Sequence, residues 1–232
     1  MKAPVIKFFF TSIVLIVMGC SEQSIDARGA CDAFEELAEK GDPYGAQPLA
    51  HCFRTGEGRQ KDLVKAEQLL LKASNSGRVE AKQDLASLYL LELENPEKYD
   101  VAIALLYEVL STGDPNSLFV LGVAEKNGLG VEKNLRKAKR YFSQAANAGH
   151  NVSVFILTMG YCYGSTHFNA DVDQCNEWAG RLKNLNYIST EAEFDKYVDH
   201  MLTSSMMRKY VFSKRDMIVI SQREAPVRRK AK

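Results

Sequence analysis

Apolar residues recur along this chain at a spacing that predicts pairs of amphipathic helices. A leucine column, with members 36 residues apart, consists of Leu49, Leu85, Leu121 and Leu157. A second column with the same interval holds large apolar side chains at Phe34, Leu70, Leu106, Phe142 and Trp178. Four members of the second column follow an alanine by four positions, which places both residues on one face of a helix.

Small residues mark the ends and the contacts of these helices at the same interval. Glycines stand at Gly41, Gly77, Gly113 and Gly149, each 11 residues after Ala30, Ala66, Ala102 or Ala138. A glycine in this place is typical of a helix C-cap. Asp42-Pro43 and Asp114-Pro115 then supply an N-cap and a first-turn proline for the following helix. A fixed period of this length indicates stacked helical repeats, and therefore an all-α fold.

The first helix of each pair carries its own pattern around the leucine column. Four residues before each leucine lies a small residue, which allows neighbouring helices to approach closely: Gly45, Ala81, Ser117 and Ser153. Glycine pairs predict the turn between the two helices at Gly56 and Gly58, and again at Gly128 and Gly130. The second repeat lacks these glycines, so Asn95-Pro96 is expected to shape a different turn there.

The period ends after Leu185 and is followed by one further helical pattern. Thr190 and Glu193 form a capping box, and apolar residues then follow helical spacing to Ser205. A repeat stack needs a cap on its open end, which this helix is expected to provide. We therefore predict a repeat domain over 30–188, a capping helix over 189–210 and a basic tail over 211–232.

The clearest copy of the pattern resembles the Sel1-like repeat family. It reads Leu121-Gly122, Gly128, Gly130, Lys137-Ala138, Ala145-Ala146 and Gly149. The resemblance covers roughly 30–185 and implies a right-handed α/α superhelical solenoid. It also implies a function in interaction, because most members are adaptors in signalling, envelope assembly and host contact. A few secreted, cysteine-rich members have been described as binding or slowly hydrolysing β-lactams.

The first residues predict export. Lys2 and Lys7 precede a short apolar run over 8–18, which ends in Val17-Met18-Gly19-Cys20. This ending resembles a bacterial lipobox and implies cleavage before Cys20 with lipid attachment there. We expect a signal peptide over 1–19, a tether over 20–29 and a location at the outer membrane, facing the periplasm. An ordinary signal peptide is the alternative.

Charge is unevenly distributed along the chain. The 232 residues carry a net charge of +1, but nine Lys or Arg lie from Arg208 onward, against Asp216 and Glu224. The tail could dock on the acidic body or contact an anionic surface, and a solvated tail is the plainer alternative. No nucleic-acid partner is expected.

Four further cysteines in an exported chain favour disulfides. Cys31 and Cys175 lie four periods apart, at opposite ends of the stack, so they cannot be bonded. Helix ends that meet instead favour Cys31–Cys52 and Cys162–Cys175. The alternative for the second pair is zinc bound by Cys162, His167 and Cys175, with Asp171 and Asp173 nearby.

No common catalytic motif is present. The sequence lacks Gly-x-Ser-x-Gly, His-Glu-x-x-His, the phosphate-binding Gly-x-x-x-x-Gly-Lys pattern and Ser-x-x-Lys. Its four histidines are scattered along the chain. We expect neither enzyme activity nor a metal or cofactor.

Binding is expected on the face of the first helices. Positions flanking the leucine column are polar in the first two repeats, at Gln47, His51, Gln83 and Ser87. They are apolar in the next two, at Phe119, Val123, Phe155 and Met159, which are the candidate groove residues for an apolar peptide. The alternative is that these four residues are ordinary core, or that the helix expected over 190–206 covers them.

The sequence therefore predicts a monomeric, non-catalytic scaffold for a protein partner, attached to the bacterial cell envelope by lipid at Cys20. Two other hypotheses remain open. One is a structural envelope component that contacts glycan or an anionic surface through its basic tail. The other is a weak β-lactam-binding or β-lactam-hydrolysing repeat protein.

Overall fold

The computed structural model describes residues 27–93, 95–164, 168–185, 191–204 and 207–212. The expected signal peptide, Cys20 and the tail from residue 213 onward lie outside these residues. Within the described ranges the regular structure is helical throughout, without a strand. None of the described helices has both the length and the apolar character needed to cross a membrane.

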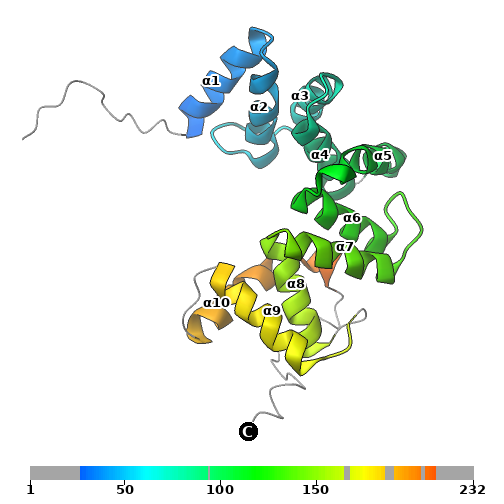
Figure 1. Cartoon of the computed structure of the whole chain (residues 1–232). Helices are drawn as coiled ribbons and strands as arrows, with labels where there is room; N and C mark the ends of the chain where they lie inside the picture. The colour runs from blue at the N-terminus through cyan, green and yellow to red at the C-terminus, as the bar shows by residue number, and fades with distance from the viewer. Residues whose placement is uncertain (1–26, 94, 165–167, 186–190, 205–206, 213–232) are drawn as a thin grey trace, which may run out of the picture.

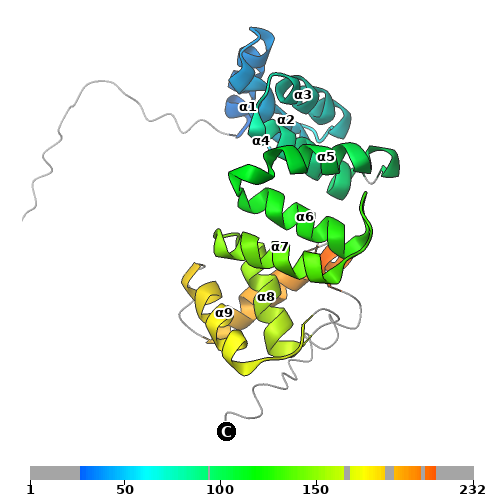
Figure 2. The ribbon, with the colours of Figure 1, turned by 45° about the vertical axis from the view of Figure 1, so that its right-hand side comes forward.

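Ten α-helices follow one another along the described chain. They are α1 (Ala27–Glu39), α2 (Pro43–Thr55), α3 (Leu63–Asn75), α4 (Val79–Ser87), α5 (Tyr99–Val109), α6 (Pro115–Asn127), α7 (Leu135–Asn147), α8 (Asn151–Tyr163), α9 (Val172–Leu185) and α10 (Glu191–Thr203). From α1 to α9, each helix packs against the next one in the sequence. Figures 1 and 2 show the result, a curved stack of helical hairpins with α1 at one end and α9 and α10 at the other. The predicted all-α repeat fold is confirmed.

The caps expected from the sequence are present. The Asp42 carboxylate accepts a hydrogen bond from the backbone N–H of Tyr44 at 2.7 Å, and the Asp114 carboxylate accepts one from Ser117 at 2.7 Å. Gly56 and Gly128 end α2 and α6 in the left-handed conformation, with φ of 83° and 78°. Such angles are costly for residues with a side chain, which explains the glycine at each of these helix ends.

The apolar columns form one continuous core. All four members of the leucine column are buried, and so are Leu70, Leu106, Phe142 and Trp178 of the second column. The small column lets helices touch, because a Cβ added to Gly45 would lie only 2.5 Å from the backbone nitrogen of Ala38 on α1. Close approach of α1 and α2 therefore depends on the absence of a side chain there.

The second repeat builds its turn differently, as its missing glycines suggested. Helix α4 continues into a π-helical turn, Leu88–Glu92, and the short 3-10 helix Pro96–Lys98 leads into α5. The Asn95 side chain accepts a hydrogen bond from the backbone N–H of Glu97 at 3.1 Å. This capping contact takes the place of the glycine turn in the neighbouring repeats.

Two expected boundaries differ from the structure. Helix α1 begins at Ala27, inside the stretch 20–29 that was expected to be a tether. At the other end, the π-helical turn Met207–Val211, here called the C-terminal turn, packs on α6 and α10. Val211 and Phe212 are buried, so the folded part extends past residue 210 into the stretch expected to be a tail. These apolar residues separate from water only by folding back onto the stack.

Candidate functional site

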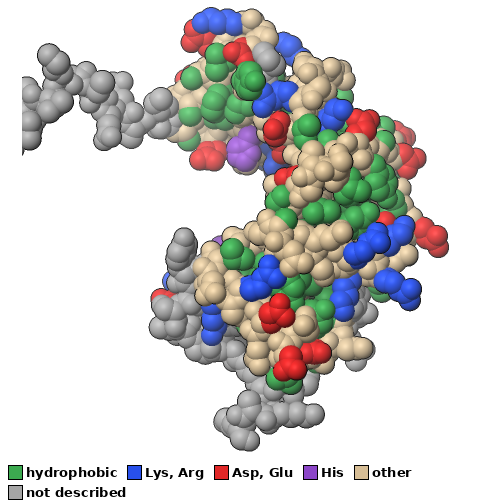
Figure 3. All heavy atoms as spheres, in the orientation of Figure 1, with side chains coloured by type: hydrophobic (Ala, Val, Ile, Leu, Met, Phe, Trp, Pro, Cys, Tyr) green, Lys and Arg blue, Asp and Glu red, His purple; other side chains and the backbone are tan. Residues whose placement is uncertain are grey.

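Two adjoining cavities follow the inner side of the curved stack, where α2 and α4 lie, while α3 and α5 lie on its outer side (Figure 1). One has a volume of about 570 Å³ and lies between α1 and α2, reaching α4. The other, of about 480 Å³, runs from α2 across α4 and α6 to the start of α8. The side chains of Gln47, Arg54 and Asp84 line both cavities, so the two form one groove. Figure 3 shows the molecule hollowed on one side, between the helices of its two ends.

A polar network crosses the groove where its two cavities join. The Gln47 side-chain amide donates to one oxygen of Asp84 at 2.7 Å, and the Arg54 guanidinium bonds the other at 3.2 Å. Arg54 also pairs with Glu92 at 3.2 Å. Burial raises the pKa of Glu92 above its usual value, and the positive charge of Arg54 opposes that shift. The network ties α2 to α4 and holds partly exposed polar groups in fixed positions.

His150 closes the groove at the start of α8. Its Nδ1 accepts a hydrogen bond from the backbone N–H of Ser153 at 3.2 Å, so the ring acts as the N-cap of α8. The ring also packs on Phe119, with 4.6 Å between the ring centroids. Burial lowers the pKa of His150 to about 4, with Asp114 acting weakly in the opposite direction. The histidine is therefore neutral near pH 7.

One contact at this end looks like a nucleophile beside a base but serves the helix instead. The Ser153 hydroxyl lies 2.9 Å from Nδ1 of His150. Ser153 is fully buried, so no substrate can reach its oxygen. The pair is a helix cap, and the geometry offers binding rather than acyl transfer.

The prediction of an apolar groove at Phe119, Val123, Phe155 and Met159 is wrong, because these side chains are 0–6% exposed. The alternative raised from the sequence holds for Phe155. Its ring packs edge-on against Tyr197 of α10, with centroids 6.0 Å apart, and against Phe212, at 6.2 Å. The C-terminal turn and α10 thus cover α8, and the apolar positions belong to the core.

The polar half of the same pattern lines the groove, where Phe119 also contributes to the wall. Gln47, Gln83 and Ser87 face the cavities, together with His51. Sequence reasoning missed Arg54 and Asp84, which lie seven residues after Gln47 and one before the leucine column. Their opposite charges on successive first helices were the available signal for an ion pair across α2 and α4.

Both disulfides form as predicted. Cys31 bonds Cys52, with Cα atoms 6.2 Å apart, and Cys162 bonds Cys175, at 4.7 Å. The zinc alternative for Cys162 and Cys175 is contradicted, since neither sulfur remains a thiolate; His167 lies outside the described residues. Across the part of the chain with described positions, no group of three or more His, Cys, Asp or Glu residues is arranged to hold a metal ion.

Comparison with known proteins agrees with the architecture. The family described as Sel1 repeat matches residues 49–77 and 115–150. DAP3-binding cell death enhancer 1 of Mus musculus is 36% identical over 86 residues, which are 37% of this chain. The Rattus norvegicus protein of the same name is 34% identical over 86 residues. This chain spans only 16% of the length of each of these curated relatives.

Two solved structures have a similar fold over most of the chain. The Sel1 repeat protein from Oxalobacter formigenes has a TM-score of 0.56 at 19% identity, covering 89% of this chain and 80% of its own. The protein c5321, a protective antigen of uropathogenic Escherichia coli strains, has a TM-score of 0.56 at 21% identity. That match covers 85% of this chain and 44% of the antigen. At this identity the likeness establishes the fold alone.

Proposed function

We propose that this chain, in which the Sel1 repeat model matches residues 49–77 and 115–150, is a monomeric, non-catalytic scaffold, because Sel1 repeats generally mediate contacts between proteins. Its groove along α2, α4 and α6 binds an extended segment or a helix of another protein. The partner segment crosses the polar network at the centre of the groove and forms hydrogen bonds with it.

The observation that carries this proposal is the ordered polar network on the inner side. Gln47, Arg54 and Asp84 are held by one another at 2.7 and 3.2 Å yet remain partly exposed. Side chains that are already fixed lose little conformational entropy when a partner binds. A serine nucleophile beside His150 would have to be accessible, and Ser153 is fully buried.

Site-specific photo-crosslinking in the cells of origin tests the groove. A photoreactive residue replaces Ser87 on α4, and in the matched control it replaces Val101 on α5, which is 50% exposed on the outer side. We expect an adduct with another polypeptide from position 87 and none from position 101. The yield of the adduct from position 87 is expected to fall when Asp84→Ala removes the centre of the network. Adducts of equal yield from both positions would contradict a groove-specific partner.

The same proposal includes attachment to the bacterial cell envelope by lipid at Cys20. Its support is the lipobox-like ending at Val17–Cys20 and the presence of two disulfides, which persist in oxidising compartments. Labelling cells with radioactive palmitate should mark the chain, and Cys20→Ala should remove the label and release the protein from membranes. An unlabelled wild-type chain would refute the anchor without affecting the groove.

The absence of catalysis has its own test. Purified protein mixed with a chromogenic β-lactam is expected to give the rate of buffer alone. Turnover that survives further purification and scales with the protein concentration would replace the scaffold with the enzyme hypothesis.

A further inference from the structure

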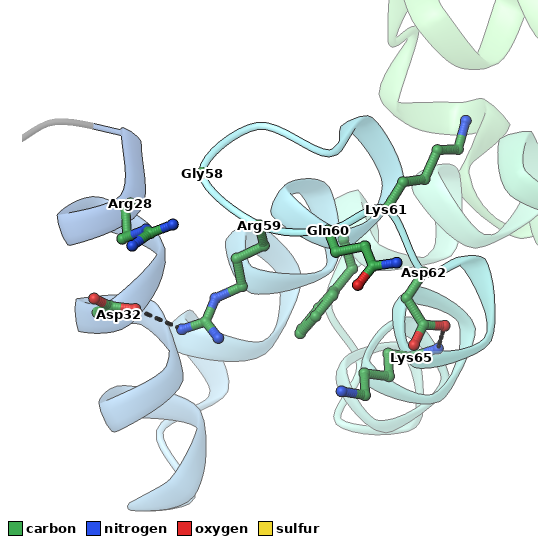
Figure 4. Close-up of a pocket in the computed structure, with 9 residues that line it drawn as sticks. Arg28, Asp32, Gly58, Arg59, Gln60, Lys61, Asp62 and Lys65 are labelled. Atoms are coloured by element: carbon green, nitrogen blue, oxygen red, sulfur yellow. Dashed lines mark hydrogen bonds and ion pairs between the residues drawn. The ribbon is translucent and has the colours of Figure 1, made fainter.

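A third cavity lies away from the groove, at the edge of the stack beside the start of α1. It has a volume of about 630 Å³. Figure 4 shows its walls: Arg28 and Asp32 come from α1, Gly58 to Lys61 from the loop between α2 and α3, and Asp62 and Lys65 from the start of α3. Phe53 of α2 also lines it. Four basic residues therefore surround one space together with two acidic ones.

Both acidic residues of this cavity are already occupied. The Asp32 carboxylate accepts a hydrogen bond from Arg59 at 2.8 Å. The Asp62 carboxylate caps α3, accepting from the backbone N–H groups of Val64 at 3.1 Å and Lys65 at 3.0 Å. Each carboxylate thus has one oxygen engaged, and the four basic residues outnumber the two acidic ones.

The basic side chains of the cavity can still form further ion pairs and hydrogen bonds. Arg28 and Lys65 make no ion pair with any carboxylate of the described residues. Arg59 binds Asp32 and, at 2.5 Å, Glu35, but its Nε is buried without a hydrogen-bond partner. A buried donor without an acceptor is costly, so Arg59 keeps hydrogen-bonding capacity beyond its two carboxylate partners.

An aromatic wall holds two of these cations in place. The Lys65 ammonium lies 5.1 Å from the centre of the Phe53 ring, and the Arg59 guanidinium carbon lies 5.7 Å from it. The Lys65 ammonium is thus directed toward Phe53, whereas Figure 4 shows the Lys61 side chain directed away from the other labelled side chains. The positive groups that share the space are therefore Arg28, Arg59 and Lys65.

The helical repeat does not require a basic residue at every one of these cavity positions. Two periods later the backbone is built in the same way, since Gly130 packs against Tyr99 as Gly58 packs against Ala27. The cavity residues Arg28, Phe53, Arg59 and Gln60 correspond there to Asp100, Glu125, Val131 and Glu132. Lys65 corresponds to Lys137, which is also basic, so the cations particular to the first repeat are Arg28 and Arg59.

We propose that this cavity binds the phosphoryl group of an organic anion. Guanidinium and ammonium groups are the side chains that recognise phosphate oxygens, and Phe53 offers an apolar surface to the rest of the ligand. The Cys31–Cys52 disulfide lies one turn after Arg28 and fixes α1 to α2, so the walls are held before binding. The phosphate comes either from a soluble organic phosphate or from an anionic lipid headgroup. This inference does not depend on the scaffold function.

The test uses the full chain, labelled with ¹⁵N-arginine and mixed with phosphatidylcholine nanodiscs. In one arm, inorganic phosphate and then glycerol 3-phosphate are titrated at constant ionic strength against chloride. In the other arm, part of the phosphatidylcholine is replaced by phosphatidylglycerol. The readout is the Nε–H signal of Arg59, the buried donor without a partner. We expect a saturable shift; the arm that produces it identifies the source of the phosphate.

Three variants decide whether the cavity is responsible. Arg28→Gln and Lys65→Gln each remove one exposed cation that faces the space, and each is expected to weaken binding roughly tenfold, the effect of one charged hydrogen bond. Lys61→Gln removes the same charge from the loop between α2 and α3. Its side chain is directed away from the other side chains of the cavity, so the substitution should leave binding unchanged. No saturable shift in either arm, or equal weakening by all three variants, would overturn the proposal.

Discussion

Acid should destabilise this protein through His150 in particular. The ring caps α8 only while Nδ1 carries no proton, because that atom accepts the hydrogen bond from Ser153. It also lies against Phe119 and is partly shielded from water. Protonation would remove the cap and place a charge in this contact, so the folded protein resists it.

The size of the effect follows from the shift in pKa. Burial lowers the pKa of His150 from 6.5 to about 4, so between these values the unfolded chain binds a proton that the folded chain does not. Stability is therefore fully present above pH 6.5 and is lost as the pH falls toward 4. A shift of this size corresponds to at most about 3 kcal/mol of unfolding free energy.

Urea denaturation of wild-type protein and His150→Asn at pH 7 and pH 4.5 measures this contribution. Asparagine can cap a helix without titrating, so the variant should lose less stability on acidification than the wild type, by about 2–3 kcal/mol. His51→Asn, which removes an exposed histidine of α2, is the control and should behave like the wild type. Equal acid sensitivity of wild type and His150→Asn would refute the reasoning.

Three further substitutions test the core and one of its disulfide bonds. Cys52→Ser opens the bond to Cys31 and should lower the free energy of unfolding by about 2–4 kcal/mol in chemical denaturation; an unchanged free energy of unfolding would contradict this. Glu125 is 1% exposed, and its oxygens lack hydrogen-bond partners although Oε1 lies 3.5 Å from the Lys137 ammonium, so Glu125→Met should stabilise by about 1–3 kcal/mol; a lower midpoint in urea would contradict this. Phe155→Ala should cost about 3–5 kcal/mol and, by opening the contact with Phe212, should increase protease cleavage near the C-terminal turn.

Features that depend on local helix geometry could be predicted from the sequence. The leucine column and the glycine caps repeat every 36 residues, and each reports a helix face or a helix end that its own neighbours in sequence determine. The disulfides followed from this frame, because Cys31 and Cys52 lie at helix ends that meet when consecutive helices pack antiparallel.

Features that depend on the non-repeating end could not be predicted. Whether Phe155 faces solvent or core is decided by Phe212, which lies 57 residues later and outside the period. The apolar pattern of α8 is the same in both cases, so periodicity alone cannot separate them. The cationic cavity was missed for a related reason. Arg28 and Lys65 come together only when α1, α3 and the loop between α2 and α3 pack against one another.

Hydrogen–deuterium exchange tests the central claim, that the stack grips a partner with its inner face, most directly. The polypeptide recovered through the Ser87 crosslink would be purified and added to the full chain. The account predicts slower exchange in α2, α4 and α6, with α3 and α5 unchanged. Added protection confined to α3 and α5, or no added protection in α2, α4 and α6 at saturating partner, would contradict it.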